Sequence, residues 1–346
     1  MKKILVTGGA GYIGSCTVIE LHKAGYTPVI VDNFSNSDKS VMARLEKVLG
    51  FSPKLYAIDC NDKEKLDAVF ELENDIAGVI HFAAHKAVGE SVQKPNMYYY
   101  NNVNSLLVLL DVMQKHGVKN IVFSSSCTVY GQPDALPVTE ETPEKTAESP
   151  YGFTKQICER ILKDQKQTGQ NFFKTVLLRY FNPVGAHESG IIGELPLGVP
   201  NNLVPYIALV ASGKLPMLTV FGDDYNTPDG SCIRDYIHVC DLALAHIQSL
   251  QWLDKAPENA CEVFNIGVGK GETVLGCIHT FEKVNGVKVP LKIGARRSGD
   301  IEKIYADNQK ALQELGWKPK YTLADAMQSV WKWQQFIDEQ IHNKKP

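Results

Sequence analysis

The first half of the chain alternates short β-branched runs with stretches in which apolar residues recur every three or four positions. The β-branched runs predict strands at 3–7, 27–32, 54–59, 77–84, 119–125 and 174–181. The stretches between them predict helices, of which the clearest are 11–25, 39–49, 62–73 and 98–116. Strands that alternate with helices build a parallel sheet with helices on both faces, and near-continuous apolar strands suit a sheet buried on both sides. The sequence therefore predicts an α/β fold with a doubly wound parallel sheet.

The alternation loosens in the second half of the chain. Glycine, proline and asparagine become frequent at 182–235, interrupted by short apolar elements, which favours a binding domain over a linker. Helical patterns return at 239–253, 273–285 and 323–341. We predict a nucleotide-binding domain at 1–181, rejoined by part of 236–265, and a smaller mixed α/β substrate-binding domain at 182–346.

Charge and cysteine usage exclude several classes of partner. A net charge of −3 leaves no excess of positive charge to displace phosphate counterions, which argues against nucleic acid. No apolar run is long enough to span a bilayer, and the apolar run after the N-terminal lysines is too short for a secretory signal. The eight cysteines are scattered without metal-ligand spacing. We expect reduced thiols, no metal site, no membrane partner and a cytoplasmic location.

A glycine-rich turn follows the first predicted strand. In TGGAGYIGS, Gly8, Gly11 and Gly14 stand between that strand and the first predicted helix. Small residues let the backbone approach a pyrophosphate, and a helix N-terminus offers free N–H groups and a positive dipole end. Asp32 ends the second strand, where a carboxylate would accept the hydroxyls of an adenosine ribose. These features predict a Rossmann domain, and the absence of arginine from DNFSNSDKS favours NAD over NADP.

The stretch SPYGFTK combines a helix start with a tyrosine and a lysine four residues apart. Ser149 suits an N-cap and Pro150 a first helical position. The helix that they begin would place Tyr151 and Lys155 on one face. A phenol with a pKa of about 10 is a poor base at neutral pH, but nearby positive charge favours the phenolate and makes tyrosine a usable general base. Taken alone, the pair is equally compatible with a capped surface helix.

The glycine spacing and the SPYGFTK stretch together resemble the extended short-chain dehydrogenase/reductase family. The resemblance implies a Ser-Tyr-Lys catalytic set, in which Ser126 of FSSSCTVYG joins Tyr151 and Lys155. Besides the glycines, Asp32 and this tyrosine-lysine pair, it implies cofactor contacts from Tyr12, Ile13, Asn33, Ser35, Asn36, Ser37, Asp59, Cys60, Phe82, Ala83, Ala84, Lys86, Asn101, Ser124 and Tyr180.

Further motifs resemble the UDP-hexose 4-epimerases of that family and run in order from Lys3 to about Trp317: RYFNPVGAH, PNNLVPYI, FGDDYNTPDGSCIRDYIHV and RRSGD. The implied reaction is the reversible interconversion of UDP-galactose and UDP-glucose by NAD-dependent oxidation at sugar C4, rotation of the 4-keto sugar and re-reduction. The implied substrate contacts are Lys86, Ser126, Thr128, Tyr151, Tyr180, Phe181, Asn182, Asn202, Leu203, Leu218, Thr219, Phe221, Arg234, Tyr236, Val274, Arg297, Asp300 and Ile304. The resemblance also implies a homodimer through helices 98–116 and 151–167.

Three points stay open at this stage. The related 4,6-dehydratases carry an acidic pair where this chain has Cys127 and Thr128, which weighs against dehydration. Another nucleotide-sugar enzyme, such as a decarboxylase, or a non-catalytic NAD-binding regulator remains an alternative. Ile304 occupies the position where a tyrosine in the family restricts the site to plain hexoses, so we expect some tolerance of N-acetylated sugars.

Overall fold

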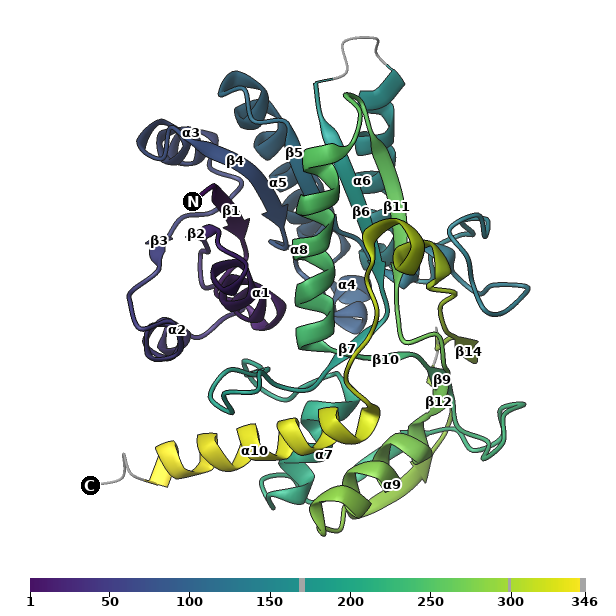
Figure 1. Cartoon of the computed structure of the whole chain (residues 1–346). Coiled ribbons are helices and arrows are strands. Elements are labelled where there is room, and N and C mark those ends of the chain that lie inside the picture. The colour runs from purple at the N-terminus through teal and green to yellow at the C-terminus, as the bar shows by residue number, and fades with distance from the viewer. Residues whose placement is uncertain (168–171, 298–299, 343–346) are drawn as a thin grey trace.

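A seven-stranded parallel sheet forms the larger part of the molecule (Figure 1). The computed structural model describes residues 1–167, 172–297 and 300–342. The strand order is β11-β6-β5-β4-β1-β2-β3, and every neighbouring pair is parallel. The strands are β1 (Lys3–Thr7), β2 (Thr27–Val31), β3 (Lys54–Tyr56), β4 (Ile76–His81), β5 (Asn120–Ser124), β6 (Lys174–Tyr180) and β11 (Cys261–Ile266). The predicted doubly wound α/β fold is confirmed.

Two strands are shorter than predicted. The third ends at Tyr56 rather than at residue 59, because the Asp59 carboxylate accepts the N–H of Asn61 in a turn (2.8 Å). The fourth ends at His81, so residues 82–84 begin a loop beyond the sheet edge. In both cases the predicted binding residues lie in the loop that follows the strand, and such loops carry the sites in parallel sheets.

Helices cover both faces of the sheet. One face carries α1 (Tyr12–Lys23), α2 (Ser40–Leu49) and α8 (Val239–Lys255), whose buried residues share one hydrophobic cluster. The other carries α3 (Lys63–Leu72), α5 (Pro95–Lys115) and α6 (Pro150–Gln167), which share a second cluster. In Figure 1, α8 lies beside α1 on the sheet although the two are far apart in sequence. The chain thus returns to the large sheet through α8 and β11.

The remaining elements form a smaller unit below the carboxyl edge of the sheet (Figure 1). Its helices are α7 (Leu203–Ala211), α9 (Val274–Asn285) and α10 (Leu323–His342), which share a hydrophobic cluster. Its strands are β7 (Asn182–Val184), β8 (Leu218–Phe221), β9 (Ile233–Arg234), β10 (Tyr236–His238), β12 (Glu272–Thr273), β13 (Leu291–Gly294) and β14 (Lys303–Ile304). The shorter helices α4 (Val88–Gln93), η1 (Cys127–Tyr130) and η2 (Ala311–Leu315) complete the structure. The division at residue 182 stays a prediction, since the chain crosses between the units more than once.

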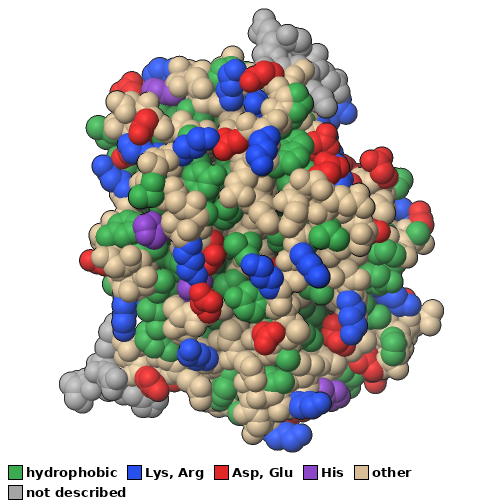
Figure 2. All heavy atoms as spheres, in the orientation of Figure 1, with side chains coloured by type: hydrophobic (Ala, Val, Ile, Leu, Met, Phe, Trp, Pro, Cys, Tyr) green, Lys and Arg blue, Asp and Glu red, His purple; other side chains and the backbone are tan. Residues whose placement is uncertain are grey.

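The surface carries charges of both signs. Figure 2 shows Lys and Arg side chains interspersed with Asp and Glu over the visible face, without a large field of one sign. None of the helices in the described ranges has the length and hydropathy that crossing a bilayer would require. All eight cysteines are free thiols, six of them buried.

Candidate active site

The glycine-rich turn between β1 and α1 brings backbone segments into close contact. Gly8 has a φ of +71°, which favours glycine, and a Cβ there would lie 2.9 Å from the Ala83 nitrogen. A Cβ on Gly14 would lie only 2.2 Å from the Gly8 carbonyl oxygen. Gly11 is the N-cap of α1 and makes no side-chain cap, so the first N–H groups of the helix face the space beyond the turn. This is the geometry that admits a pyrophosphate.

Asp32 lies just after β2, and its carboxylate accepts hydrogen bonds from the glycine-rich turn and from the loop that follows it. Its Oδ2 accepts the Ala10 N–H (3.0 Å), and its Oδ1 accepts the Phe34 N–H (2.8 Å) and the Ser37 hydroxyl (3.0 Å). The carboxylate therefore has a defined orientation beside the glycine turn. Asn33 donates to Asp59 across the neighbouring strand end (2.9 Å), which joins two predicted cofactor contacts.

Tyr151 and Lys155 occupy the first turns of α6. The Ser149 hydroxyl accepts the Gly152 N–H (3.1 Å), and Pro150 is the first helical residue, as the sequence predicts. The Lys155 ammonium donates to the Ser124 carbonyl at the end of β5 (2.7 Å). It lies 5.9 Å from the centre of the Tyr151 ring. The two side chains share one face of the helix and are both buried.

Burial shifts the pKa of both members of this pair. It raises the pKa of the Tyr151 phenol to about 12, and a hydrogen bond with Ser126 offsets this rise only in part. Burial also lowers the pKa of Lys155 to about 8. Positive charge beside the phenol would lower its pKa, which is the role that we predicted for Lys155 and a bound nicotinamide ring.

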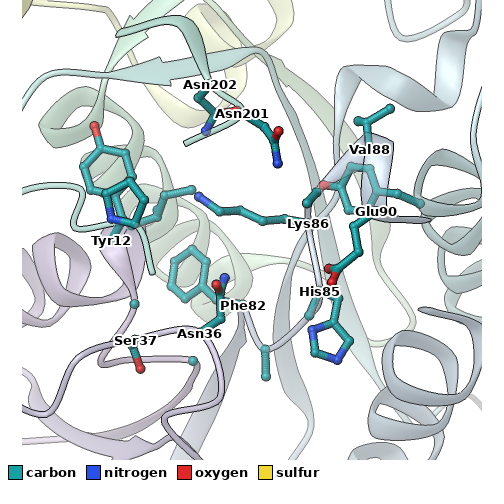
Figure 3. Close-up of a pocket in the computed structure, with 18 of the residues that line it drawn as sticks. Tyr12, Asn36, Ser37, Phe82, His85, Lys86, Val88, Glu90, Asn201 and Asn202 are labelled. Atoms are coloured by element: carbon teal, nitrogen blue, oxygen red, sulfur yellow. The ribbon is translucent and has the colours of Figure 1, made fainter. Parts of the chain in front are cut away.

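A cavity of about 1120 Å³ connects these features, and Figure 3 shows part of it. Every predicted cofactor contact lines it except Ser124, whose hydroxyl is taken by His246 (2.9 Å). Lys86 extends across the cavity from the loop after β4 (Figure 3) and forms an ion pair with Glu194 (2.9 Å). The lining continues into the smaller unit through the predicted substrate contacts Thr128, Asn182, Asn202, Arg234, Arg297, Asp300 and Ile304.

Other predicted substrate contacts do not line this cavity. Leu218 and Tyr236 are buried in the core of the smaller unit, and Leu203 and Val274 pack against that core. Phe181 is buried in a separate cluster beneath the cavity. Ser126 lies beside Tyr151, but its hydroxyl accepts the Thr128 N–H (3.2 Å) at the start of η1. Thr219 and Phe221 lie on β8, outside the cavity.

The two predicted diphosphate-binding arginines differ in their surroundings. Arg234 lines the cavity and donates to its neighbour's carbonyl at Ile233 (2.9 Å). The adjacent carboxylate of Asp235 accepts instead from the N–H groups of Val268, Gly269 and Ala306. These contacts direct the Asp235 carboxylate to backbone N–H groups rather than to the neighbouring Arg234 side chain.

Arg297 and Asp300 contact each other, with an ion pair of 2.7 Å. Both residues are among the predicted substrate contacts, and both line the cavity. Arg297 also lies 5.4 Å from the centre of the partly exposed Phe221 ring. Residues 298 and 299 of the RRSGD motif lie outside the described residues.

Arg44 and Glu194 are two of the lining residues that the sequence analysis did not predict. Arg44 of α2 lines the cavity, although no arginine occurs in the DNFSNSDKS stretch that we searched for one. Arg44 lies one helical turn after Ser40, the last residue of that stretch, and its Nη1 donates to the Ser40 hydroxyl (2.7 Å). A search extended by one helical turn would have included it. Glu194 lies in a loop with no local pattern, and its partner Lys86 is distant in sequence.

The donor set fits a dinucleotide and a further polar ligand. Within the described ranges, the Arg44 Nε and the Thr128 hydroxyl are buried without a hydrogen-bond partner. Buried polar atoms of this kind are rarely left unsatisfied, so each is a candidate ligand contact. A cofactor seated on the glycine turn would extend toward Tyr151 along a wall of Phe82, Ala83 and Ala84. Fold and site together define an extended short-chain dehydrogenase/reductase.

Comparisons with known proteins identify the family within this class to which the chain belongs. The family model described as GDP-mannose 4,6 dehydratase matches residues 5–330. UDP-glucose 4-epimerase 2 of Arabidopsis thaliana is 50% identical over 335 residues, covering 96% of this chain and 95% of the relative. The UDP-glucose 4-epimerase of Bacillus subtilis is 50% identical over 331 residues, covering 96% of each. The crystal structure of the Bifidobacterium longum UDP-glucose 4-epimerase with NAD⁺ and UDP has a TM-score of 0.92 at 50% identity, covering 97% of this chain and 98% of that one. The chain belongs to the UDP-glucose 4-epimerase family.

We predict that Gly14→Ala loses bound cofactor. The added Cβ would meet the Gly8 carbonyl oxygen at 2.2 Å and force the turn apart. Affinity for NAD should fall about 10-fold or more, equivalent to about 1.4 kcal/mol. The measurement is the NAD content of the purified protein together with NAD titration. Gly89→Ala is the matched control, because Gly89 lines the same cavity but its Cβ would meet open space. Equal NAD affinity in both variants would contradict the prediction.

Proposed function

We propose that the chain interconverts UDP-galactose and UDP-glucose, with NAD as its cofactor. The observation that carries this proposal is the position of Tyr151 and Lys155 on one continuous cavity, between the glycine turn at one end and Arg234 and Arg297 at the other. A dinucleotide and a nucleotide sugar can therefore meet at the phenol. The family membership and the NAD and UDP named for the Bifidobacterium structure support the same reading.

The chemistry divides between the cofactor and the side chains. NAD supplies a reversible hydride acceptor for the sugar C4, and its nicotinamide ring carries positive charge. The phenol of Tyr151 takes the proton of the 4-hydroxyl, and that cationic ring together with Lys155 opposes the rise of the phenol pKa that burial causes. The Ser126 hydroxyl lies beside Tyr151, and the Thr128 hydroxyl, which is buried without a partner, can bind the sugar from the cavity wall.

Epimerisation also requires that the 4-keto sugar rotate within the site, so that its other face meets the cofactor, while the nucleotide stays bound in place. Arg234 and Arg297 can hold a diphosphate through charge-assisted hydrogen bonds. The sugar end is lined by Tyr180, Cys127 and Thr128, which offer few strong polar contacts. Firm contacts at one end and weak ones at the other allow rotation without release.

The matched family model is named for a dehydratase, but the site does not favour dehydration. Elimination of water needs an acid and a base beside the sugar. Cys127 and Thr128 occupy the expected positions, and burial raises the pKa of the Cys127 thiol to about 12. Neither side chain exchanges protons readily at neutral pH, so re-reduction of the ketone is the better supported outcome.

The test is an NMR time course of the purified protein with UDP-galactose, first without added cofactor and then with NAD. UDP-glucose should appear in the wild type. Tyr151→Phe should lower turnover about 10²- to 10⁴-fold, because the general base is lost, while NAD content stays unchanged. A 4-keto-6-deoxy product would support a dehydratase instead. No product even with NAD present would support a regulator or another nucleotide sugar.

We also propose that N-acetylated UDP-sugars are accepted. Ile304 lines the cavity and its backbone pairs with Arg234 across β14 and β9. Its side chain is smaller than a tyrosine and leaves room next to the sugar. Ile304→Tyr should lower kcat/KM for UDP-N-acetylgalactosamine about 10-fold or more, the discrimination that a filled apolar pocket gives, while that for UDP-galactose changes little. Ile304→Val is the control that keeps the space open. Failure of the wild type to turn over the N-acetylated sugar would end this proposal.

A homodimer through α5 and α6 is the proposed assembly. These helices expose Tyr100, Leu107 and Phe153, which are 74%, 44% and 46% exposed. Exposed apolar side chains gathered on adjacent helices often mark a protein interface. Sedimentation should give twice the chain mass, and Leu107→Glu with Phe153→Glu should give the monomer, because buried unpaired charge is costly. Leu72→Glu, at an exposed site on α3, is the control. A wild-type monomer would contradict the prediction.

The eight free thiols support the proposed cytoplasmic location.

A further inference from the structure

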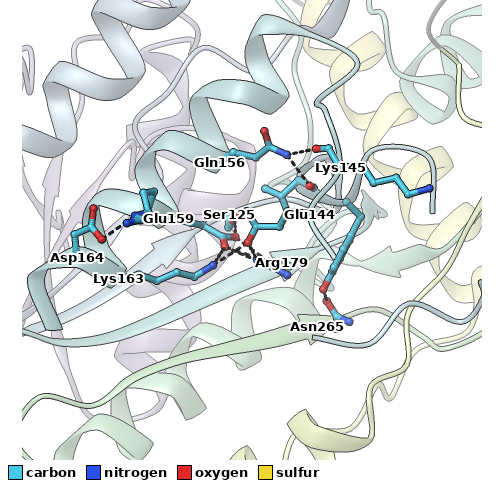
Figure 4. Close-up of polar contacts among 12 residues, drawn as sticks. Ser125, Glu144, Lys145, Gln156, Glu159, Lys163, Asp164, Arg179 and Asn265 are labelled. Atoms are coloured by element: carbon cyan, nitrogen blue, oxygen red, sulfur yellow. Dashed lines mark hydrogen bonds and ion pairs between the residues drawn. The ribbon is translucent and has the colours of Figure 1, made fainter. Parts of the chain in front are cut away.

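A buried charged cluster joins α6 to β6 next to the end of β5 (Figure 4). Its centre is an ion pair of Arg179 with Glu159, which are 2% and 0% exposed. The Arg179 Nη2 lies 2.6 Å from the Glu159 Oε2, and its Nε donates to Oε1 at 2.9 Å. Glu144 and Lys163 complete the cluster on its more exposed side. Neither member of the central pair lines the cavity.

The cluster contacts Ser125, the middle one of the three serines at the end of β5. The Ser125 hydroxyl donates to the Glu159 Oε1 (2.5 Å). The preceding residue, Ser124, accepts the Lys155 ammonium through its carbonyl (2.7 Å), and the following residue is Ser126. Glu159 stands one helical turn after Lys155. One carboxylate therefore holds the end of β5 against the helix that carries Tyr151 and Lys155.

Stability alone does not explain this arrangement. A buried ion pair loses solvation that its attraction only roughly repays, and its members are often replaceable by apolar residues. What the ion pair does supply is a fixed direction for the Glu159 oxygens, since Arg179 binds both of them. Figure 4 shows Ser125 meeting Glu159 and Arg179 at one point. This contact therefore joins the segment just after β5, which carries Ser126, to α6, which carries Tyr151.

We propose that Glu159 is a positioning residue of the reaction, which through Ser125 and Arg179 sets the place of Ser126 relative to Tyr151 and Lys155. The inference rests on the proposed function, because it assigns Glu159 a part in that same proton transfer. Glu159 acts through its neighbours and touches neither cofactor nor sugar. A misplacement of reacting groups by a fraction of an ångström lowers turnover without weakening substrate binding.

The charge of Glu159 also acts on Lys155. Burial lowers the pKa of Lys155 to about 8, and the neighbouring Cys158 and Glu159 oppose that fall. Lys155 also faces His81 of β4, whose pKa burial lowers to about 3, while burial raises the pKa of Cys158 to about 12. Both therefore keep one charge state between pH 5 and pH 9. Removal of the Glu159 charge should destabilise the ammonium and lower its pKa further.

The titratable neighbours of Tyr151 also keep one charge state near neutral pH. Tyr151 faces Cys127, Tyr98 and Tyr180, and burial raises the pKa of each of them above its usual range. None gains or loses a proton near neutral pH. A change in the pH profile after substitution of Glu159 would therefore report the pair of Tyr151 and Lys155.

The first experiment uses Ser125→Ala in the full-length protein with its cofactor. Folding should tolerate this change, because Arg179 still donates to the Glu159 oxygen that Ser125 leaves. Turnover of UDP-galactose should fall about 10-fold, the effect of a lost orientation, with KM and NAD content unchanged. Ser249→Ala is the matched control, since Ser249 is also fully buried and hydrogen-bonded, but on α8. The melting temperatures of the two variants should be similar.

The second experiment replaces Glu159 with glutamine, which keeps the hydrogen bond from Ser125 but removes the charge. The fall of kcat at alkaline pH reports the loss of the Lys155 proton. Because the substitution should lower the pKa of Lys155, this fall should move to lower pH by about half a unit or more. Asp164→Asn, which removes an exposed carboxylate of the same helix paired with Arg160, should leave the profile unchanged.

The outcomes separate the two proposals. If the wild type forms no UDP-glucose, the proposed function fails and this inference fails with it. If the wild type is active but Ser125→Ala matches Ser249→Ala in kcat, Glu159 is only a structural residue and the inference is overturned. If Glu159→Gln does not fold, Ser125→Ala decides; if it folds with an unshifted profile, the electrostatic role is overturned.

Discussion

Parallel pairing of the seven strands is the constraint on which the site depends. Because every strand points the same way, the loops after β1, β2, β3, β4 and β5 all open at one edge of the sheet. The glycine turn, Asp32 and Lys86 come from three of these loops, and the three serines from a fourth. The smaller unit covers this same edge (Figure 1), so its Arg234 and Arg297 line the same cavity as the glycine turn.

Burial at this edge has opposite effects on the catalytic groups. It raises the pKa of Tyr151 and lowers that of Lys155, so the protein alone holds both in their neutral forms more readily than water would. The same low polarity strengthens the electrostatic interaction between a charge that enters the cavity and the groups around it. A cationic ring bound beside the phenol therefore has a larger influence than it would in solution. Under the proposed function, the cofactor thus contributes to proton transfer as well as to hydride transfer.

The sequence predicts features whose partners are close along the chain. Ser149, Tyr151 and Lys155 lie within two helical turns, and the glycine turn lies within one loop, so local periodicity suffices to place them. Contacts between distant segments carry no such signal: Ser125 with Glu159 and Lys86 with Glu194 become visible only in the fold. β11 was not predicted as a strand, although we predicted that part of 236–265 rejoins the first domain. The resemblance named Leu218 and Tyr236 as contacts, but their apolar bulk is needed in the core of the smaller unit.

A direct hydrogen bond ties the two units together beside the glycine turn. The Tyr12 hydroxyl of α1 donates to the Gly185 carbonyl in the loop after β7 of the smaller unit (2.6 Å). Under the proposed function, Arg234 and Arg297 of the smaller unit bind the diphosphate, and this hydrogen bond fixes their side of the cavity relative to the cofactor. The sugar is then the part of a bound substrate that is left to rotate.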